Sequence, residues 1–195
     1  MLLLLSAEPG EGKSMLVSNL AYTLAESGKT VAAVDCNLRS PKLNRLFGLS
    51  NQIGLTDVLE QKASLNTALQ KSHFENISVL TSGIFSNHPT QLLGSPQMSN
   101  LIATLRQQFD YVLLDSPAFL AVPDTLTLTQ YADGLLPIIR RTFAKQETFE
   151  EVNLFLAGFH EKVIGLIVNQ AEDTSSSYSY PGNQKTINKF VFREN

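Results

Sequence analysis

Short runs of consecutive apolar residues recur along the chain, with longer segments of mixed polarity between them. Runs of this kind that end at polar residues are typical of β-strands buried on both faces of a sheet. We therefore expect strands at LLLLS near the start, TVAAVD (30–35), NISVLT (76–81), DYVLLD (110–115), GLLPII (134–139) and KVIGLIVN (162–169).

The segments between these runs carry helical patterns. The first extends from Lys13 to about Ser27 and is followed by Gly28, a common helix stop, and its leucines recur at spacings of four: Leu16, Leu20 and Leu24. A second helix is expected at 96–108, with one apolar stripe formed by Met98, Leu101, Ile102 and Leu105, and a third at 146–157. The stretch 43–72 is less regular and predicts short helical pieces.

Strands that alternate with helices predict an α/β fold in three layers, with a mainly parallel sheet flanked by helices on both faces. This pattern extends over residues 1–170, which we interpret as one domain. Residues 171–195 are polar and rich in Ser, Asn and Gly, and they predict a flexible tail.

Charge and composition narrow the class of protein. The chain has 15 Lys and Arg against 18 Asp and Glu, so its net charge of -3 offers no basic surplus for nucleic acid, and we expect none as a partner. The single cysteine, Cys36, allows no intramolecular disulfide, which is consistent with a reducing cytoplasm. The opening MLLLL is far shorter than the roughly 20 apolar residues that span a bilayer, so we interpret it as a buried strand.

A glycine-rich loop follows the first predicted strand and opens the first predicted helix. Residues 7–14, AEPGEGKS, fit the pattern A/G-x-x-x-x-G-K-S, in which backbone N–H groups and a helix N-terminus cradle phosphate. The alternative is a strand-to-helix turn with a solvated lysine, but strand, loop and helix all coincide with the motif. The residues expected to bind the nucleotide here are Pro9, Gly10, Glu11, Gly12, Lys13, Ser14 and Met15. Lys13 is expected to reach the β- and γ-phosphates and Ser14 to bind Mg²⁺.

A nucleotide site with a metal also requires carboxylates. Asp35 and Asp115 each end a predicted strand, and open parallel sheets place their ligands at the carboxyl ends of the strands. Both are candidate metal residues. The alternative for each is a helix cap or an ordinary loop residue. Asp124, which follows Pro123, is interpreted as a helix N-cap, with a role near the nucleotide as the alternative.

Several motifs in the same order resemble the bacterial tyrosine kinases, which are cytoplasmic autokinase domains of polysaccharide chain-length regulation. SAEPGEGKS, VAAVDCNLRSP and YVLLDSPA resemble the Walker A, Walker A′ and Walker B motifs of that family, and the intervening GLTDVL, VPDTLTLTQYADG and GLIVNQ agree as well. The resemblance covers roughly residues 1–170. The broader relatives are the partition and septum-positioning ATPases.

The resemblance implies a role for each matched position. Lys13 and Ser14 would contact phosphate and metal, Asp115 would hold Mg²⁺ through water, and Asp35 would act as a base or a metal contact. Arg39 matches the basic catalytic residue of Walker A′, and Asn169 matches the position that reads the adenine edge. The alternative for Asn169 is a turn residue at a strand end. The implied cofactors are ATP and Mg²⁺.

Two positions depart from related patterns. The partition-type ATPases carry an additional lysine where this chain has Glu8, which favours the kinase branch. The kinase pattern D-x-D is Asp35-Cys36-Asn37 here, and Asn37 cannot accept a proton as a carboxylate does. Losing one negative charge near the metal would weaken phosphoryl transfer while nucleotide binding survives.

The resemblance also implies phosphate acceptors and partners. The family phosphorylates a C-terminal tyrosine cluster, largely between subunits, and the candidates here are Tyr178 and Tyr180; the alternative is that both are merely tail tyrosines. Family members commonly have a helical arm before the first strand for ring assembly, whereas this sequence starts on that strand. We expect a homo-oligomer, a ring or a dimer, and an activating membrane chain-length protein that keeps this cytoplasmic domain at the inner face of the plasma membrane.

The sequence therefore predicts an ATP-dependent tyrosine autokinase that regulates the chain length and export of exopolysaccharide or capsular polysaccharide. Two alternatives stay open. One is a partition-type ATPase switch that phosphorylates no tyrosine, and the other is a catalytically weak nucleotide-binding subunit that serves in assembly.

Overall fold

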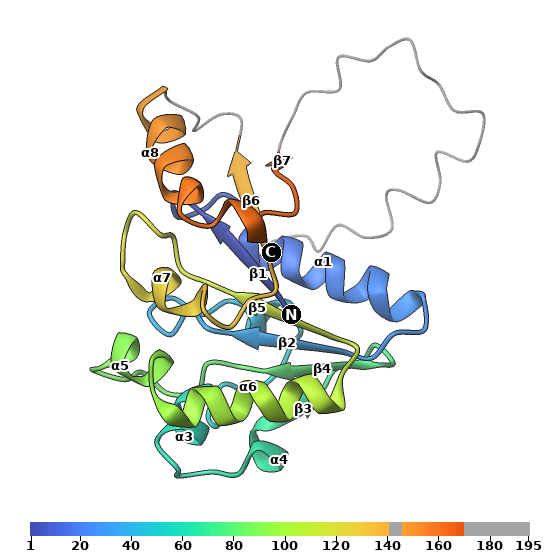
Figure 1. Cartoon of the computed structure of the whole chain (residues 1–195). Helices are drawn as coiled ribbons and strands as arrows, with labels where there is room; N and C mark the ends of the chain where they lie inside the picture. The colour runs from blue at the N-terminus through green and yellow to red at the C-terminus, as the bar shows by residue number, and fades with distance from the viewer. Residues whose placement is uncertain (141–145, 170–195) are drawn as a thin grey trace, which may run out of the picture.

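Seven strands form one sheet in the computed structural model, which describes residues 1–140 and 146–169 (Figure 1). Their order is β3-β4-β2-β5-β1-β6-β7, and every neighbouring pair is parallel except β3 with β4. The strands are β1 (Leu2–Ser6), β2 (Val31–Asp35), β3 (Leu69–Lys71), β4 (Ile77–Leu80), β5 (Tyr111–Asp115), β6 (Gly134–Arg140) and β7 (Ile167–Asn169). The predicted mainly parallel sheet is confirmed.

Helices cover both faces of the sheet, because successive strand residues point to opposite sides. Leu4 packs with α1 (Lys13–Glu26) and α2 (Leu43–Leu46) on one face. Leu3 and Leu5 pack on the other face with residues of the remaining helices: α3 (Leu55–Leu59), α4 (Leu65–Ala68), α5 (Pro89–Leu93), α6 (Pro96–Gln108), α7 (Asp124–Leu128) and α8 (Gln146–Ala157). Figure 1 shows α1 and α6 on either side of the strands, so the expected three layers are confirmed.

The long helices begin and end close to their predicted positions, but the leucines of α1 are not its most buried residues. Val17 and Ala21 are fully buried and Ala25 nearly so, whereas Leu16, Leu20 and Leu24 are partly buried beside them. Small side chains on the central stripe let the helix approach the sheet closely, and the leucines fill the space on its flank. In α6 all four predicted stripe residues are buried.

The structure differs from the sequence prediction at both edges of the sheet. Only Ile167–Asn169 of the predicted strand 162–169 is a strand, and it pairs with the end of β6. The chain before it forms a short 3₁₀ turn, His160–Lys162. Gly165 also disfavours a strand at this point, because glycine has no side chain to pack against the sheet. At the other edge, β3 lies within the stretch expected to hold only helical pieces; its three residues, LQK, are too few and too polar to reveal a strand.

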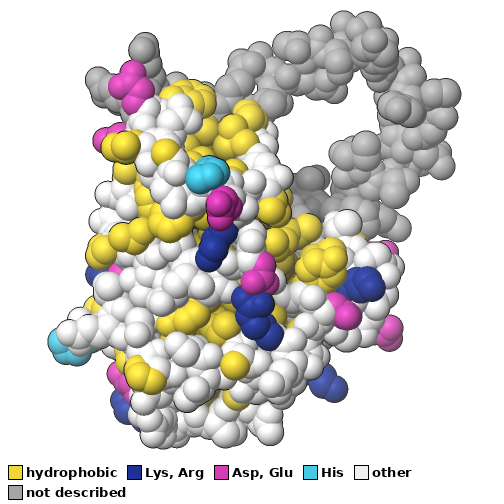
Figure 2. Space-filling model, viewed as in Figure 1, with side chains coloured by type: hydrophobic (Ala, Val, Ile, Leu, Met, Phe, Trp, Pro, Cys, Tyr) yellow, Lys and Arg dark blue, Asp and Glu magenta, His cyan; other side chains and the backbone are white. Residues whose placement is uncertain are grey.

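No described helix combines the length and the apolar character needed to cross a membrane. Several large apolar side chains are nevertheless exposed, among them Leu126 on α7 and Leu154 on α8. Figure 2 shows hydrophobic surface in the part of the molecule where α7 and α8 lie in Figure 1. The predicted tail, 171–195, with Tyr178 and Tyr180, lies outside the described residues.

Candidate active site

Three central strands end at one edge of the sheet and bring the motif residues together. β1, β2 and β5 are parallel neighbours, so their carboxyl ends meet at the same edge. The register pairs Asp115 with both Leu4 and Asp35. The two acids that are far apart in sequence are thus adjacent, and the loop that leaves β1 begins beside them.

The loop between β1 and α1 has the shape of a phosphate cradle. Gly10 and Gly12 have φ angles of 85° and 99°, which glycine adopts without the steric cost that other residues incur. A Cβ atom at Gly12 would also lie 2.3 Å from Nδ2 of Asn169, so this position requires glycine for space as well. Helix α1 begins at Lys13, and its N-terminus therefore faces the loop and favours an anion there.

The ammonium group of Lys13 is buried and donates a hydrogen bond to the hydroxyl of Ser6 at the end of β1. Burial lowers the pKa of Lys13, while the nearby negative charges of Asp115 and Glu11 act in the opposite direction. A buried ammonium with neighbouring acids but no ion pair of its own among the described residues is well suited to receive a phosphate.

Glu11 holds the loop in place from the side that faces away from the cavity. Its side chain is buried, and its carboxylate accepts hydrogen bonds from the N–H groups of Glu8 (2.8 Å) and Arg140 (3.0 Å). The Asn169 side chain donates to the carbonyl oxygen of Glu11 at 2.9 Å. The phosphate loop is therefore tied to the ends of β6 and β7.

Asp35 and Asp115 differ in how their carboxylates are satisfied. The Asp35 carboxylate accepts N–H groups from Asn37 (3.2 Å), Lys42 (3.0 Å) and Leu43 (2.9 Å). Both carboxylate oxygens of Asp115 are buried and accept no hydrogen bond from any residue in the described ranges. Burial raises the pKa of both acids; the charge of Asp115 adds to this for Asp35, and the nearby Ser14 and Lys13 side chains oppose it for Asp115.

These residues fit a hard divalent cation. Two buried oxygens without partners at Asp115, the neighbouring carboxylate of Asp35 and the nearby Ser14 hydroxyl form an oxygen-only donor set, which Mg²⁺ prefers. A bound cation would satisfy the Asp115 oxygens and offset the repulsion between the two acids.

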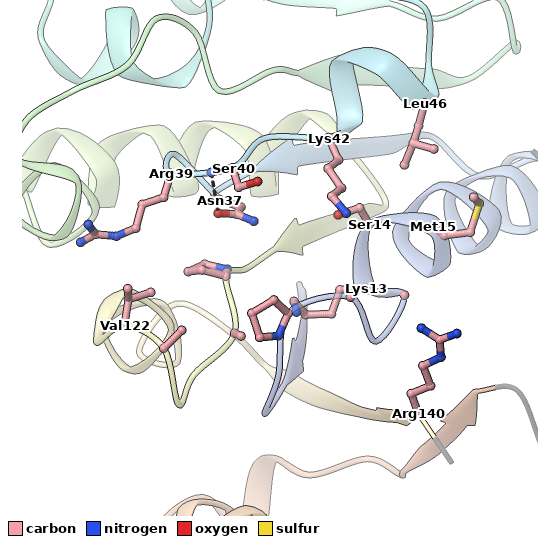
Figure 3. A pocket seen from close by; sticks show the side chains of 16 residues that line it. Lys13, Ser14, Met15, Asn37, Arg39, Ser40, Lys42, Leu46, Val122 and Arg140 are labelled. Carbon is pink, nitrogen blue, oxygen red and sulfur yellow. Dashed lines mark hydrogen bonds between the residues drawn. The ribbon is translucent and has the colours of Figure 1, made fainter. Parts of the chain in front are cut away.

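A cavity of about 480 Å³ opens in front of the loop (Figure 3). Of the predicted site residues, Pro9, Gly10, Gly12, Lys13, Ser14, Met15 and Arg39 line it, whereas Glu11 and Asn169 lie behind the loop. Other residues that line the cavity had no role assigned from the sequence, among them Ser40, Lys42, Pro117 and Arg140. Ser40 and Pro117 lie within the segments that resemble Walker A′ and Walker B, whereas no local pattern marks Lys42 and Arg140, because only the folded sheet brings them to the loop.

Residues 4–161 match the family model described as an AAA domain. The chain is 38% identical over 178 residues to tyrosine-protein kinase YwqD of Bacillus subtilis (strain 168), and the match covers 91% of this chain and 75% of that protein. The chain belongs to the bacterial tyrosine-kinase family. It spans only 22% of a longer relative, the succinoglycan biosynthesis transport protein ExoP of Rhizobium meliloti (strain 1021), to which it is 31% identical over 86% of its own length.

Solved structures agree with this assignment. The crystal structure of the VpsO kinase domain superimposes on this chain with a TM-score of 0.82 and is 32% identical to it in sequence. The match covers 87% of this chain and 84% of the VpsO chain. The septum site-determining protein MinD of Pyrococcus horikoshii, in complex with Mg-ADP, has a TM-score of 0.72 at 23% identity, over 88% and 71%. At this level of identity, the similarity to MinD shows only that the two proteins share a fold, the P-loop nucleotide-binding fold.

Arg39, the basic residue of the tyrosine-kinase Walker A′ segment, is engaged by Asp124. Its Nε donates to Oδ2 of Asp124 at 2.8 Å and its Nη2 to Oδ1 at 3.2 Å. Asp124 is fully buried and also accepts a hydrogen bond from Thr90. The expected N-cap role of Asp124 is wrong: Pro123 occupies the cap position, and the carboxylate binds these two side chains instead.

Asn37, the departure from the kinase pattern, lies on the cavity wall. Its Oδ1 accepts the N–H group of Ser40 at 3.2 Å, so the side chain supports the turn after β2. An aspartate could accept the same hydrogen bond, and the structural consequence of asparagine here is therefore the absence of a negative charge.

Proposed function

We propose that this chain is an ATP-dependent protein-tyrosine kinase that phosphorylates its own tail. One observation carries the proposal: the buried Lys13 ammonium, at the end of the glycine-rich loop, lies near the Asp115 carboxylate, whose oxygens accept no hydrogen bond from the described residues. Phosphoryl transfer depends on positioning and electrostatic stabilisation, and these groups supply both.

In this proposal the backbone of residues 9–14 and the Lys13 ammonium bind the phosphates of ATP. Ser14 and Asp115, with Asp35 as an alternative contact, would hold Mg²⁺, which would neutralise charge on the phosphates of ATP. The tyrosine hydroxyl forms a bond to the γ-phosphorus, the bond from that atom to the β–γ bridging oxygen breaks, and ADP leaves. The Asp35 carboxylate takes the phenolic proton, in its role as base rather than as metal contact.

Arg39 and Asn169 take roles beside this centre. Arg39 lies on the cavity wall, and its pairing with Asp124 holds the segment after β2 in place. Asn169 packs against Gly12 at the end of β7, which supports a role at the base end of the nucleotide. The proposed phosphate acceptors are Tyr178 and Tyr180.

We also propose that the kinase serves polysaccharide export together with a membrane chain-length protein, at the inner face of the plasma membrane. The relative named as a succinoglycan biosynthesis transport protein supports the polysaccharide connection. The exposed apolar side chains on α7 and α8 support a protein partner or a second copy of the chain, since oligomers bury such surface.

Asn37 favours, as the second candidate, a protein that phosphorylates no tyrosine, in one of two forms. Without the second acid, the protein would bind nucleotide and turn it over weakly, as an assembly subunit or a switch. Phosphotyrosine separates the kinase from both, and phosphate release separates a switch from an inert subunit.

The test is phosphate mapping by mass spectrometry. The full chain is treated with phosphatase and then incubated with ATP and Mg²⁺, with and without a juxtamembrane activator peptide, and Lys13→Met serves as the control. We expect phosphate on Tyr178 or Tyr180 only in the protein that keeps Lys13. An unmodified tail in every condition, with ATP binding intact, would favour the second candidate.

A further inference from the structure

Lys42 lies at a position in the cavity to which the sequence motifs assign nothing. It immediately precedes α2, seven residues after Asp35, and its side chain lines the cavity. Figure 3 shows this side chain directed into the cavity toward the start of α1, where Ser14 and Lys13 lie.

The backbone of Lys42 is fixed by the site itself. Its N–H group donates to Oδ2 of Asp35 at 3.0 Å, and the next N–H group, of Leu43, donates to the same oxygen at 2.9 Å. Asp35 is fully buried, so the point from which the Lys42 side chain extends is held rigidly relative to the two acids.

The Lys42 ammonium forms no ion pair with any acid in residues 1–140 and 146–169. Its charge nonetheless acts on the two ionisable groups at the centre of the site, Lys13 and Asp115. Burial lowers the pKa of Lys13 and raises that of Asp115, and the positive charge of Lys42 lowers the pKa of both groups. Asn37, on the same wall, is neutral and offers no carboxylate to neutralise this lysine.

We propose that Lys42 is a second phosphate-binding lysine, which contacts the terminal phosphate of bound ATP from the wall opposite the glycine loop. This inference rests on the proposed nucleotide-binding function. The ammonium is a mobile point charge with three donors. It lies on a cavity wall where Asn37 is neutral and the guanidinium of Arg39 is already paired with Asp124, so Lys42 offers an anion a cation that has no ion pair among the described residues.

The proposal connects two features of this wall. Asn37 removes a negative charge from the region where Mg²⁺ is expected, and Lys42 adds a positive one there. A bound triphosphate would then draw part of its charge neutralisation from protein rather than from metal. ATP, which carries the terminal phosphate, should depend on Lys42 more than ADP does.

Isothermal titration calorimetry on the full chain tests this, with a non-hydrolysable ATP analogue and ADP, each in Mg²⁺. The variants are Lys42→Ala, Lys42→Arg and the matched control Lys71→Ala, which removes an exposed lysine from the edge strand β3. We expect Lys42→Ala to weaken the ATP analogue about tenfold, as for one lost charge-assisted hydrogen bond, and ADP by less than about threefold. Lys42→Arg should retain most of the affinity, and Lys71→Ala all of it.

Equal losses for the analogue and ADP, or no loss for either, would overturn the proposal while the nucleotide-binding function stood. Failure of the unsubstituted chain to bind either nucleotide would overturn both. A thermal melt of each variant accompanies the titrations; an unchanged melting temperature for Lys42→Ala, expected for an exposed side chain, assigns the lost affinity to the missing charge.

Discussion

Asp115 is a residue whose charge the fold itself disfavours. Burial raises its pKa, and the attraction of Lys13 only partly offsets this, so the ionised carboxylate costs stability at neutral pH. We expect Asp115→Asn to raise the free energy of unfolding of the metal-free protein by about 1–3 kcal/mol while it abolishes phosphoryl transfer. Urea denaturation in EDTA and a phosphorylation assay measure the two effects.

The stability gained through Asp115→Asn should depend on pH in one direction only. The penalty is present in full above the raised pKa of folded Asp115 and disappears below its ordinary value of 3.8, where the group is protonated in both states. The gain from Asp115→Asn should therefore shrink as the pH falls through this window. The matched control, Asp110→Asn, should be neutral or destabilising, because hydrogen bonds from Thr30 lower the pKa of Asp110. A gain that persists at low pH would contradict this electrostatic explanation.

Asn37→Asp should restore the second negative charge of the kinase pattern D-x-D, which this chain lacks. The Ser40 N–H group can bond to a carboxylate as it does to the amide, so the turn should keep its shape. One added negative charge on the cavity wall should tighten Mg²⁺ binding about tenfold and raise the rate of tail phosphorylation. Calorimetry with Mg²⁺ measures the first effect. The control is Asn100→Asp, the same change at an exposed position on α6, which should leave Mg²⁺ affinity unaltered.

At the scale of single residues, the sequence identified those whose neighbours in the chain form a motif. Lys13 and Ser14 stand in the glycine loop, and Asp115 stands at a strand end that apolar periodicity marks. Lys42 and the Asp124 pairing could not be predicted in the same way. Their importance comes from partners up to 85 residues away, such as Arg39, which only the strand order brings near.

Among the elements, the segment after β2 is joined to α7 through the ion pair of Arg39 and Asp124. Arg39 is partly exposed, but Asp124 is fully buried, so loss of Arg39 leaves a buried carboxylate with only Thr90 as a side-chain partner among the described residues. We expect Arg39→Ala to cost about 1–3 kcal/mol of stability, and the double substitution with Asp124→Ala to cost less than the sum of the two.

A double-mutant cycle in urea measures this coupling. The comparison pair is Arg106 and Asp133, whose Nη2 to Oδ1 distance is 2.7 Å but whose side chains are both substantially exposed. That cycle should give below about 1 kcal/mol, as solvent screens exposed pairs. Equal coupling energies in the two cycles would mean that burial of Asp124 does not strengthen its ion pair.

Whole elements were predictable wherever the pattern was long. α6 and α8 follow the predicted bounds because a helix of 12 or 13 residues repeats its stripe several times. β3 and β7, with three residues each, carry too little pattern, and their pairing with β4 and β6 is decided by the sheet that already exists. The order of the strands likewise depends on contacts that no local pattern contains.

For the whole molecule, nucleotide binding should appear as thermal stability. A ligand that binds only the folded chain, at about 100 times its dissociation constant, adds roughly 2.7 kcal/mol. At about 2–4 °C per kcal/mol for a domain of this size, the melting temperature should rise by roughly 5–10 °C with a non-hydrolysable ATP analogue and Mg²⁺. Differential scanning fluorimetry measures the shift. Chelation of Mg²⁺ should reduce it, and Lys13→Met should abolish most of it.

The hydrogen bond from Asn169 to Glu11 joins the last described strand to the first loop, across 158 positions of sequence. A ribosome releases the glycine loop early and β7 late, and domains fold as units while the chain emerges. A nascent chain therefore carries the phosphate loop for most of its synthesis without the strand that braces it. Competence to hold ATP should then coincide with near-completion of the domain.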